Sequence, residues 1–321
     1  MNPTVSVAMC TYNGSRFLRE QLESIAAQSR RPDELVVFDD VSRDDTRSIL
    51  KAFADHSEFP VRLFANKERL GAARNFQQAI QACEGEIIVL SDQDDVWRPH
   101  KLMSVVEAFR QHPDAVYAFS DAAMVDQSGK PLGQTFWEVV RLRQSIDAFS
   151  GARQVEILLR HNLIPGAALA FRASFREKLL PLPEGWMHDY WIVLLGSILG
   201  SGTAVNEVLL DYRSHAAQVC GWGKKSFAQI CKDSFGSSSD DSWKKLESFR
   251  QVLDRVAAFS PSTSSFRERV RLLEEKEAHL LRRAQARSSS GVSRIGQVIR
   301  EATTGRYRRF SNSWYSMIRD L

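Results

Sequence analysis

The chain has 321 residues, of which 43% are hydrophobic and 26% are charged. This composition is ordinary for a globular protein with one large domain or two modest ones, and it argues against a disordered or fibrous chain. The four cysteines form no CxxC pair and no Cys/His cluster has zinc spacing, which excludes a zinc finger.

The net charge of +4 is distributed unevenly along the chain. Residues 224–321 hold 20 Lys and Arg against 11 Asp and Glu, whereas residues 1–223 hold 23 against 28. The carboxylate-rich part is suited to metal chemistry. The basic part is suited to an anionic partner such as a lipid surface, although a solvated basic helix explains the same charges equally well.

Several features indicate a cytoplasmic protein. Cys10 and Cys83 lie in or beside apolar segments and are expected to be buried thiols, as in a reducing compartment. The first residues carry no basic leader before an apolar stretch, so we expect no signal peptide. The longest nearly apolar run, 190–202, is shorter than the roughly 20 residues that span a bilayer.

Strands and helices alternate regularly over the first 120 residues. Apolar runs predict strands at 5–10, 35–38, 61–65, 87–90 and 115–119. Helical spacing predicts helices at 16–28, 46–54, 72–83 and 99–111. Alternation of this kind predicts an α/β fold with a mostly parallel central sheet covered by helices on both faces.

The rest of the chain is less regular. We expect a strand at 167–171, a helix at 188–199, a strand at 204–210 and a polar linker at 233–242, followed by helices. Near the end of the chain, apolar residues recur at helical spacing in two rows. Residues 282–321 also contain nine Arg and only two acidic residues. The rows are Val292, Ile295, Ile299 and Ala302, and then Phe310, Trp314, Met317 and Leu321.

Polar residues follow three of the predicted strands. Thr11, Tyr12 and Asn13 follow the first strand, the segment 39–45 with four Asp follows the second, and Asp92-Gln93-Asp94-Asp95 follows the fourth. In an open parallel sheet, ligands bind beyond the carboxyl ends of the strands. These side chains are therefore expected to meet at one ligand-binding edge.

The carboxylates at 92–95 suit a hard divalent cation such as Mg²⁺ or Mn²⁺, because like charges packed so closely are costly without one. The alternative is that Asp residues serve turns and helix caps. We favour a helix cap for Asp44, Asp45 and Thr46, and metal binding for 92–95, where three carboxylates exceed the need of a cap. The chain has no GxxxxGK[ST] and no GxGxxG motif, which argues against a P-loop ATPase or a dinucleotide enzyme.

Four segments in order resemble glycosyltransferase family 2: VSVAMCTYN (5–13), VFDDVSRDDT (37–46), LGAARN (70–75) and VLSDQDDVW (89–97). The last resembles the rhamnosyltransferase-like branch. The resemblance covers about residues 3–220. It implies an inverting enzyme with the A-type nucleotide-diphosphosugar fold: a catalytic domain at 1–223, with a nucleotide-binding half at 1–120 and an acceptor half at 121–223, and a basic helical extension at 224–321.

The resemblance also implies roles for the residues of the first half. Tyr12 matches the residue that stacks on the base, Asp40 the one that hydrogen-bonds the base edge, and Asp92 the acid near the ribose. Arg74 lies where the family places a residue near the nucleotide. The expected nucleotide-binding set is Thr11, Tyr12, Asn13, Asp40, Arg74, Asp92 and Gln93.

In the second half, the resemblance makes Asp189 the general base, and Asp94 with His215 the metal ligands. Asp189 and His215 each have a structural alternative, since Asp189 could cap a helix and His215 could be a structural residue. The expected residues near the donor sugar or the acceptor are Asp95, Gly166, His188 and Trp191. Gly166 could equally belong to an ordinary turn after Pro165. Tyr190 before Trp191, and the sequence Ala-Ala-Gln at 216–218, depart from the family pattern.

The implied function is transfer of a sugar from a nucleotide-sugar to a glycan or lipid-linked acceptor in bacterial surface polysaccharide synthesis, such as O-antigen or exopolysaccharide. The first expectation for the donor is dTDP-rhamnose, with UDP- and GDP-sugars as alternatives. Mg²⁺ or Mn²⁺ is the expected cofactor. The basic C-terminal helices are expected to lie on the anionic inner face of the cytoplasmic membrane, with a dimer face as the alternative. Nucleic acid is not an expected partner.

Two other functions fit part of the sequence. Asp92 to Val96 also satisfies the DxDx[TV] pattern of haloacid-dehalogenase-like phosphatases, in which Asp92 would be the nucleophile. That motif usually follows the first strand, whereas here it follows the fourth. A non-catalytic protein tethered to the membrane by its tail is the second alternative, and the intact Asp94, Asp189 and His215 argue against it.

Overall fold

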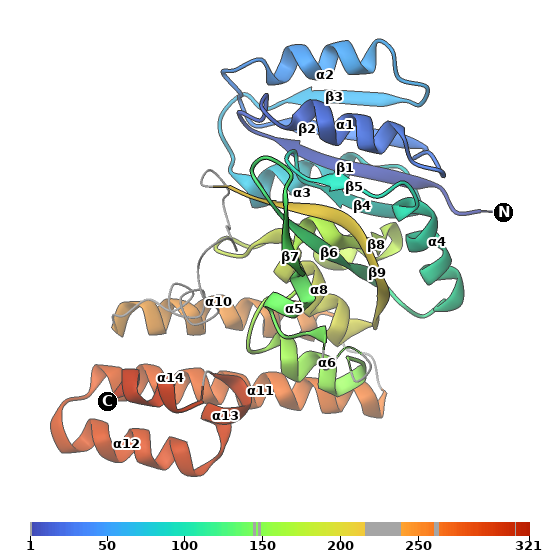
Figure 1. Ribbon diagram of the computed structural model, residues 1–321. Helices are drawn as coiled ribbons and strands as arrows, with labels where there is room; N and C mark the ends of the chain where they lie inside the picture. The colour runs from blue at the N-terminus through green and yellow to red at the C-terminus, as the bar shows by residue number, and fades with distance from the viewer. Residues whose placement is uncertain (1, 144–145, 147–148, 216–238, 260–262, 312) are drawn as a thin grey trace.

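The computed structural model describes residues 2–143, 146, 149–215, 239–259, 263–311 and 313–321. They build one nine-stranded sheet with the order β3-β2-β1-β4-β8-β6-β9-β5, and β7 pairs with β6 (Figure 1). The strands are β1 Val5–Thr11, β2 Glu34–Asp39, β3 Val61–Ala65, β4 Ile87–Ser91, β5 Val96–Trp97, β6 Tyr117–Asp126, β7 Pro131–Thr135, β8 Leu169–Arg172 and β9 Gly202–Ser214.

The first half of the sheet is parallel, as the sequence predicts. β2 pairs with β1 and β3, and β4 pairs with β1, all in parallel. β1 and β4 are buried along their whole length, since helices cover both faces of the sheet. Three connecting helices return the chain to the start of each next strand: α1 Leu18–Ala26, α2 Thr46–Ala54 and α3 Ala72–Ala82.

The second half of the sheet is mixed rather than parallel. β8 runs antiparallel to both β4 and β6, whereas β6 and β9 are parallel to each other. The sequence does not predict β5 or β7: β5 has two residues, and β7 (PLGQT) is exposed and lacks an alternating pattern. β5 nevertheless matters, because it pairs Val96 with Asp211 of β9 and so ties the acidic segment 92–95 to the end of β9.

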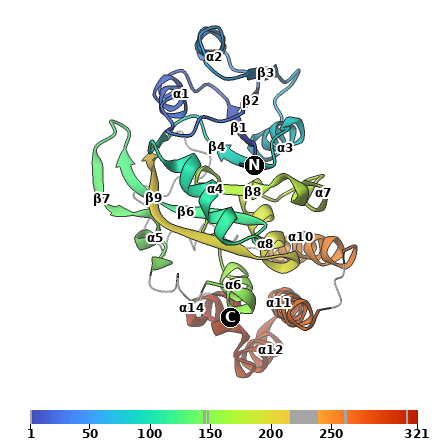
Figure 2. The ribbon, with the colours of Figure 1, turned by 90° about the vertical axis from the view of Figure 1, so that its right-hand side faces the viewer.

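Helices form the layers around this sheet (Figures 1 and 2). The remaining helices are α4 Lys101–Gln111, α5 Phe136–Val139, α6 Gly151–Leu158, α7 Arg176–Leu179, α8 His188–Leu199, α10 Ser239–Ala257, α11 Ser264–Ser288, α12 Gly291–Thr303, α13 Arg306–Phe310 and α14 Ser313–Asp320, with 3₁₀ turns at Gly166–Ala168 and Ala173–Phe175. α8 is apolar on nearly every side and buried, as its sequence indicates.

The C-terminal helices fall into two groups. α10 and α11 share the main apolar core through residues such as Val252 and Leu273, whereas Val298 of α12 and Tyr307 of α13 join Ala286 in a small second cluster. The predicted boundary at 223/224, most of the predicted linker, Cys220 and Cys231 lie outside the described residues. Cys10 and Cys83 are buried free thiols, as predicted.

The structure agrees with the first of the two predicted apolar rows near the C-terminus at three of its positions, and it disagrees with the second. Val292, Ile295 and Ile299 do share one exposed face of α12. The second row is wrong as a single face, because Phe310 is fully buried at the end of α13 while Trp314 of α14 is 66% exposed. The chain adopts an extended conformation at Ser311, which separates these two short helices.

Among the described residues, no helix is both long enough and apolar enough to cross a membrane.

Gly202 gives a test of the packing between β6 and β9. A Cβ added at Gly202 would lie 2.1 Å from Cζ of Tyr117, a fully buried side chain whose hydroxyl is 2.7 Å from the Ser197 hydroxyl. We expect Gly202→Ala to lower the free energy of unfolding by about 1–3 kcal/mol through overpacking, as measured by urea denaturation. Gly296→Ala is the control: no atom lies within 4 Å of its added Cβ in α12, so stability should be unchanged or slightly raised. Equal losses in both variants would contradict this packing.

Candidate active site

The carboxyl ends of β1, β2 and β4 lie side by side, as expected. Thr11 at the end of β1 is in register with Asp39 at the end of β2, and its hydroxyl donates to Asp39 Oδ2 over 3.0 Å. Ser91 ends β4 beside Met9 of β1. The three polar segments that follow these strands therefore share one edge of the sheet.

The side chain of Gln93 holds the loop that follows β1. Its amide accepts from the Tyr12 backbone N–H over 2.8 Å and donates to the Tyr12 carbonyl over 3.0 Å. Asn13 adopts a left-handed backbone conformation with φ of 47°, and its side-chain oxygen accepts from the Arg43 N–H. Both residues, predicted to bind nucleotide, thus fix the position of Tyr12 in this structure.

The ring of Tyr12 is partly exposed and is covered by a cation. The Arg69 guanidinium carbon lies 3.9 Å from the ring centroid, a cation–π contact. Arg69 was not among the residues predicted from the sequence. A base that stacks on Tyr12 must either use the other face of the ring or replace this guanidinium.

Asp40 organises the loop that carries Arg69. Its buried carboxylate accepts from the backbone N–H groups of Leu70 and Gly71 over 2.7 and 2.9 Å, and from the Asn66 amide. Arg74, one turn into α3, is exposed and lies 3.7 Å from the Glu184 carboxylate. It is therefore near the edge but outside the buried part of the site.

Three carboxylates crowd the loop after β4. Burial and then the carboxylates of Asp94 and Asp189 raise the pKa of Asp92 to about 7. Burial, followed by Asp94 and Asp92, raises the pKa of Asp95 well above its ordinary value. Asp95 Oδ1 accepts from the Arg213 N–H over 3.0 Å, and Asp95 Oδ2 is buried with no hydrogen-bond partner. Such a group favours a cation nearby.

Lys101 lies beneath these carboxylates and is almost completely buried. Its ammonium donates to the Ala167 carbonyl over 2.5 Å and lies 3.9 Å from the centroid of the Trp97 ring. Burial lowers the pKa of Lys101 to about 7, although Asp95 and Asp92 act in the opposite direction. Lys101 therefore brings a buried amine to the cluster and tethers α4 to the turn that contains Gly166.

Asp94 and His215, the two predicted metal ligands, contact each other directly. Asp94 Oδ2 lies 2.7 Å from His215 Nε2, and the His215 ring packs against Phe17. Arg213 supports both: its Nε donates to the Asp94 carbonyl over 2.8 Å, and its other end pairs with Glu20. Pairing of β5 with β9 brings these residues together.

Within the described residues, no three His, Cys, Asp or Glu side chains surround a single point in the manner of metal ligands. Two protein ligands still fit a cation such as Mg²⁺, which keeps several waters and is commonly bound by one or two carboxylates plus substrate phosphates. The unpaired Asp95 oxygen and the Asp94–His215 contact are consistent with that arrangement.

The predicted residues of the second half meet at the start of α8. A Cβ added at Gly166 would lie 2.8 Å from His188 Nε2 and 3.7 Å from Asp189 Cβ, so only glycine lets this turn approach α8. Asp189 lies in the first turn of α8, where Oδ1 accepts from the Tyr190 N–H over 2.6 Å. The Gly166 turn that contacts Asp189 is also tethered to Lys101 through the Ala167 carbonyl, which links Asp189 to the acidic cluster.

His188 is buried, and neither ring nitrogen has a hydrogen-bond partner. Its ring stacks on Phe76 with centroids 3.8 Å apart. Burial lowers the pKa of His188, which keeps the imidazole neutral at neutral pH. An unsatisfied buried imidazole beside the glycine turn is suited to hydrogen-bond a ligand there.

Trp191 does not lie where the sequence analysis expected it. The side chain is fully buried, and its indole N–H donates to the Leu179 carbonyl over 2.9 Å. It packs edge-on against Trp186 and beneath Arg255. Trp191 is a core residue that anchors α8, and its contact with an acceptor is not supported.

A signal for Lys101 was available in the sequence. Lys101, Val105 and Ala108 recur at helical spacing and share the buried face of α4. A lysine on an apolar face must find a carbonyl or a carboxylate. No comparable pattern marks Arg213 or Arg69, whose roles depend on partners distant in sequence.

Comparison with known proteins gives the family. A sequence profile described as Glycosyl transferase family 2 matches residues 6–179. The uncharacterized glycosyltransferase alr2836 of Nostoc sp. is 29% identical over 220 residues, which cover 66% of this chain and 65% of that protein. TuaG of Bacillus subtilis, named as a teichuronic acid biosynthesis glycosyltransferase, is 29% identical over 130 residues, 40% of this chain and 51% of TuaG. The chain thus spans less than two thirds of these relatives.

A solved structure supports the same conclusion for the fold. The mannosyltransferase PcManGT from Pyrobaculum calidifontis, in complex with GDP-Man and Mn²⁺, superposes with a TM-score of 0.57 at 17% identity, covering 100% of this chain and 86% of that chain. At this identity the likeness concerns the fold alone. Because the profile match covers more than half of the sequence, the chain belongs to glycosyltransferase family 2 and has the A-type fold of that family.

Proposed function

We propose that this protein is a metal-dependent, inverting glycosyltransferase. The observation that carries the proposal is the meeting of the 92–95 carboxylates, His215 and Asp189 at one edge of the sheet, from β4, the end of β9 and α8. Sugar transfer from a nucleotide-sugar needs a site for a cation with a diphosphate and a separate carboxylate. The acidic loop at 92–95 is suited to the first role and Asp189 to the second.

In this proposal Asp189 is the general base. It draws the proton from the acceptor hydroxyl as that oxygen attacks the anomeric carbon, and a single displacement inverts that centre. No residue needs to form a covalent bond with the sugar. His188 is kept neutral by burial beside Asp189, and we assign it a hydrogen bond to the donor sugar at the Gly166 turn.

Asp94 and His215 would hold the cation, with Asp92 and Asp95 close behind them. A divalent cation at this position offsets, as a Lewis acid, the negative charge of the departing nucleoside diphosphate. Mn²⁺ in the structure of PcManGT supports a divalent metal, and Mg²⁺ is equally compatible with the oxygen ligands. Tyr12 and Asp40 remain our proposed contacts to the base, and we propose that Thr11 and Arg74 lie at the border of the nucleotide site.

The name of TuaG supports a role in bacterial surface polysaccharide synthesis. We propose a glycan or a lipid-linked glycan as acceptor, with O-antigen or exopolysaccharide as the product class. For the donor, dTDP-rhamnose remains our first candidate beside UDP- and GDP-sugars. A lipid-linked acceptor would place the enzyme at the inner face of the cytoplasmic membrane, which the basic C-terminal residues favour.

A phosphatase that uses Asp92 as nucleophile is less well supported. The DxDx[TV] motif of such phosphatases usually follows the first strand, whereas Asp92 follows β4, the fourth strand along the chain. The organised loops at Tyr12 and Asp40 have no use in that reaction.

Binding of the donor is tested by thermal melting with dTDP, UDP and GDP, each with and without Mn²⁺ or Mg²⁺. One nucleotide should raise the melting temperature by a few degrees only when the cation is present, because ligands that bind the folded state stabilise it. Asp94→Asn should lose this shift. Asp45→Asn is the control, an exposed carboxylate at the same edge with no side-chain bond to its helix, and it should keep the shift. The absence of any shift with all three nucleotides would contradict the proposal.

The role of Asp189 is tested by steady-state kinetics with the donor found in that screen. We expect Asp189→Asn to lower kcat by about 10²–10⁴-fold, the range typical of a lost general base, with donor binding retained. Glu184→Gln, which changes a highly exposed carboxylate shortly before α8, should leave kcat unchanged. Full activity of Asp189→Asn would assign the base elsewhere.

Lys101→Met tests whether the buried amine of Lys101 contributes positive charge to the site. Losing one positive charge should weaken binding of the anionic donor by about tenfold and strengthen binding of Mn²⁺, so the KM for donor and the half-saturating Mn²⁺ concentration should move in opposite directions. Lys276→Met is the matched control, since Lys276 is also buried but bonds to Phe310 in the C-terminal helices. A parallel loss of both affinities would indicate a structural role only.

A further inference from the structure

We propose that α12 and α14 form a docking surface for a bilayer rich in anionic lipid. The proposal extends the proposed function, because a lipid-linked acceptor would lie in such a bilayer. It is carried by the side chains that these helices expose and by the side chains that they bury.

Each of the two helices exposes a row of large apolar side chains. On α12, Val292 and Ile299 are 86% and 57% exposed, and Ile295 lies between them at helical spacing. On α14, Trp314 is 66% exposed and Ile318 and Leu321 follow on the same face. Rows of this kind are costly in water and are typical of helices that lie in a membrane interface, where Trp is favoured.

Within residues 282–321, which carry both rows, the exposed charged side chains are of one sign. Residues 282–321 contain nine Arg and only two acidic residues, Glu301 and Asp320. Both carboxylates are buried, whereas Arg282, Arg300 and Arg308 are exposed. The ionised side chains that this segment presents to solvent are therefore all cationic.

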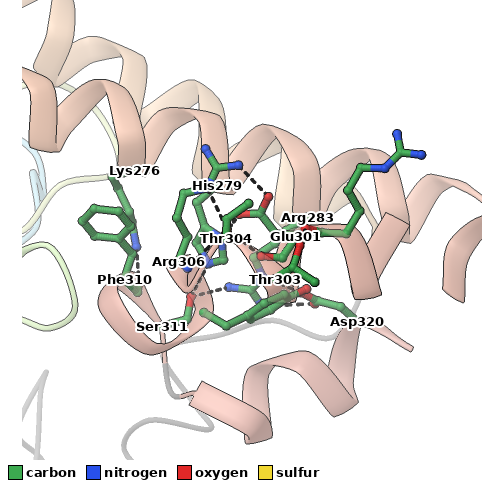
Figure 3. A network of polar contacts seen from close by, with 12 residues as sticks. Lys276, His279, Arg283, Glu301, Thr303, Thr304, Arg306, Phe310, Ser311 and Asp320 are labelled. Atoms are coloured by element: carbon green, nitrogen blue, oxygen red, sulfur yellow. Dashed lines mark hydrogen bonds and ion pairs between the residues drawn. The ribbon is translucent and has the colours of Figure 1, made fainter. Parts of the chain in front are cut away.

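The buried carboxylates are held in a polar network between the helices (Figure 3). Glu301 accepts from His279 over 2.7 Å and pairs with Arg306 over 2.8 Å. Asp320 pairs with Arg283 and Arg287 over 2.5 and 2.6 Å.

This network fixes α12 and α14 against α11 and keeps both negative charges inside. It also explains how helices with such exposed apolar rows remain folded, since their inner faces are held by polar contacts. The outer faces are then left with apolar and cationic groups.

These features favour a lipid bilayer over a second copy of the chain. A symmetric dimer would bring the same face of both copies together and would place Arg300 and Arg308 near like charges. An anionic bilayer satisfies both groups at once: the apolar side chains enter the interface and each nearby Arg gains from the negative surface. In Figure 1, α12 and α14 lie at the opposite end of the molecule from β1–β3 and extend toward the side to which the carboxyl ends of these strands point.

Vesicle co-sedimentation tests the surface with the full chain. Wild type should bind vesicles that contain phosphatidylglycerol and should not bind vesicles of phosphatidylcholine alone. Val292→Ser/Ile299→Ser/Trp314→Ser should abolish binding. Arg300→Gln/Arg308→Gln should weaken it by about tenfold or more, because each Arg near the surface contributes several-fold.

Two matched variants serve as controls. Met103→Ser/Leu132→Ser removes exposed apolar side chains elsewhere, and Arg19→Gln/Arg110→Gln removes exposed charge elsewhere. Both should bind as wild type does. The proposal would be overturned if wild type did not bind phosphatidylglycerol vesicles, if it bound both lipids equally, or if the control variants lost binding to the same extent. It would also be overturned if wild type bound no lipid but formed a dimer that the apolar triple variant converts to a monomer. The nucleotide-dependent thermal shift should persist in every variant, which separates failure of this surface from failure of the proposed function.

Discussion

Three carboxylates lie within four residues at the end of a buried strand, and their mutual repulsion constrains everything around them. Lys101 brings a buried amine to this cluster, and Arg213 and His215 approach from the end of β9. These groups do not fully balance the carboxylates, since Asp95 keeps an unpaired buried oxygen and the pKa of Asp92 is raised to about 7. In the proposed function, a divalent cation that binds together with an anionic diphosphate would complete the balance.

The two halves of the sheet contribute different parts of this arrangement. The parallel half, β1 to β4, brings Thr11, Asp39 and Asp92 to one edge because its strands share a direction. In the mixed half, β8 runs antiparallel to β4 and β9 runs parallel to β6, and the end of β9 returns the chain to that edge. The short β5 joins the halves, and the tether from Lys101 to Ala167 links the acidic loop to the glycine turn beside Asp189.

The sequence predicted elements with strong local patterns and missed features that depend on distant partners. Helices at Thr46–Ala54 and His188–Leu199 match the structure because their apolar spacing is continuous. β7 was missed because it is exposed, and Trp191 was misplaced because a motif match cannot distinguish an aromatic that anchors a helix from one that lines a site. Gln93 and Asn13 were predicted as nucleotide ligands, whereas their hydrogen bonds hold a loop.

A metal site at Asp94 and His215 is tested most directly by a crystal structure of the full chain with Mn²⁺ and the nucleoside diphosphate that binds it, with the metal located by anomalous scattering. We expect one Mn²⁺ peak within coordination distance of both Asp94 and His215, about 2.0–2.3 Å from their ligand atoms, and in contact with the diphosphate. A nucleotide bound at this edge with no metal peak there, or a metal held by other residues, would contradict it.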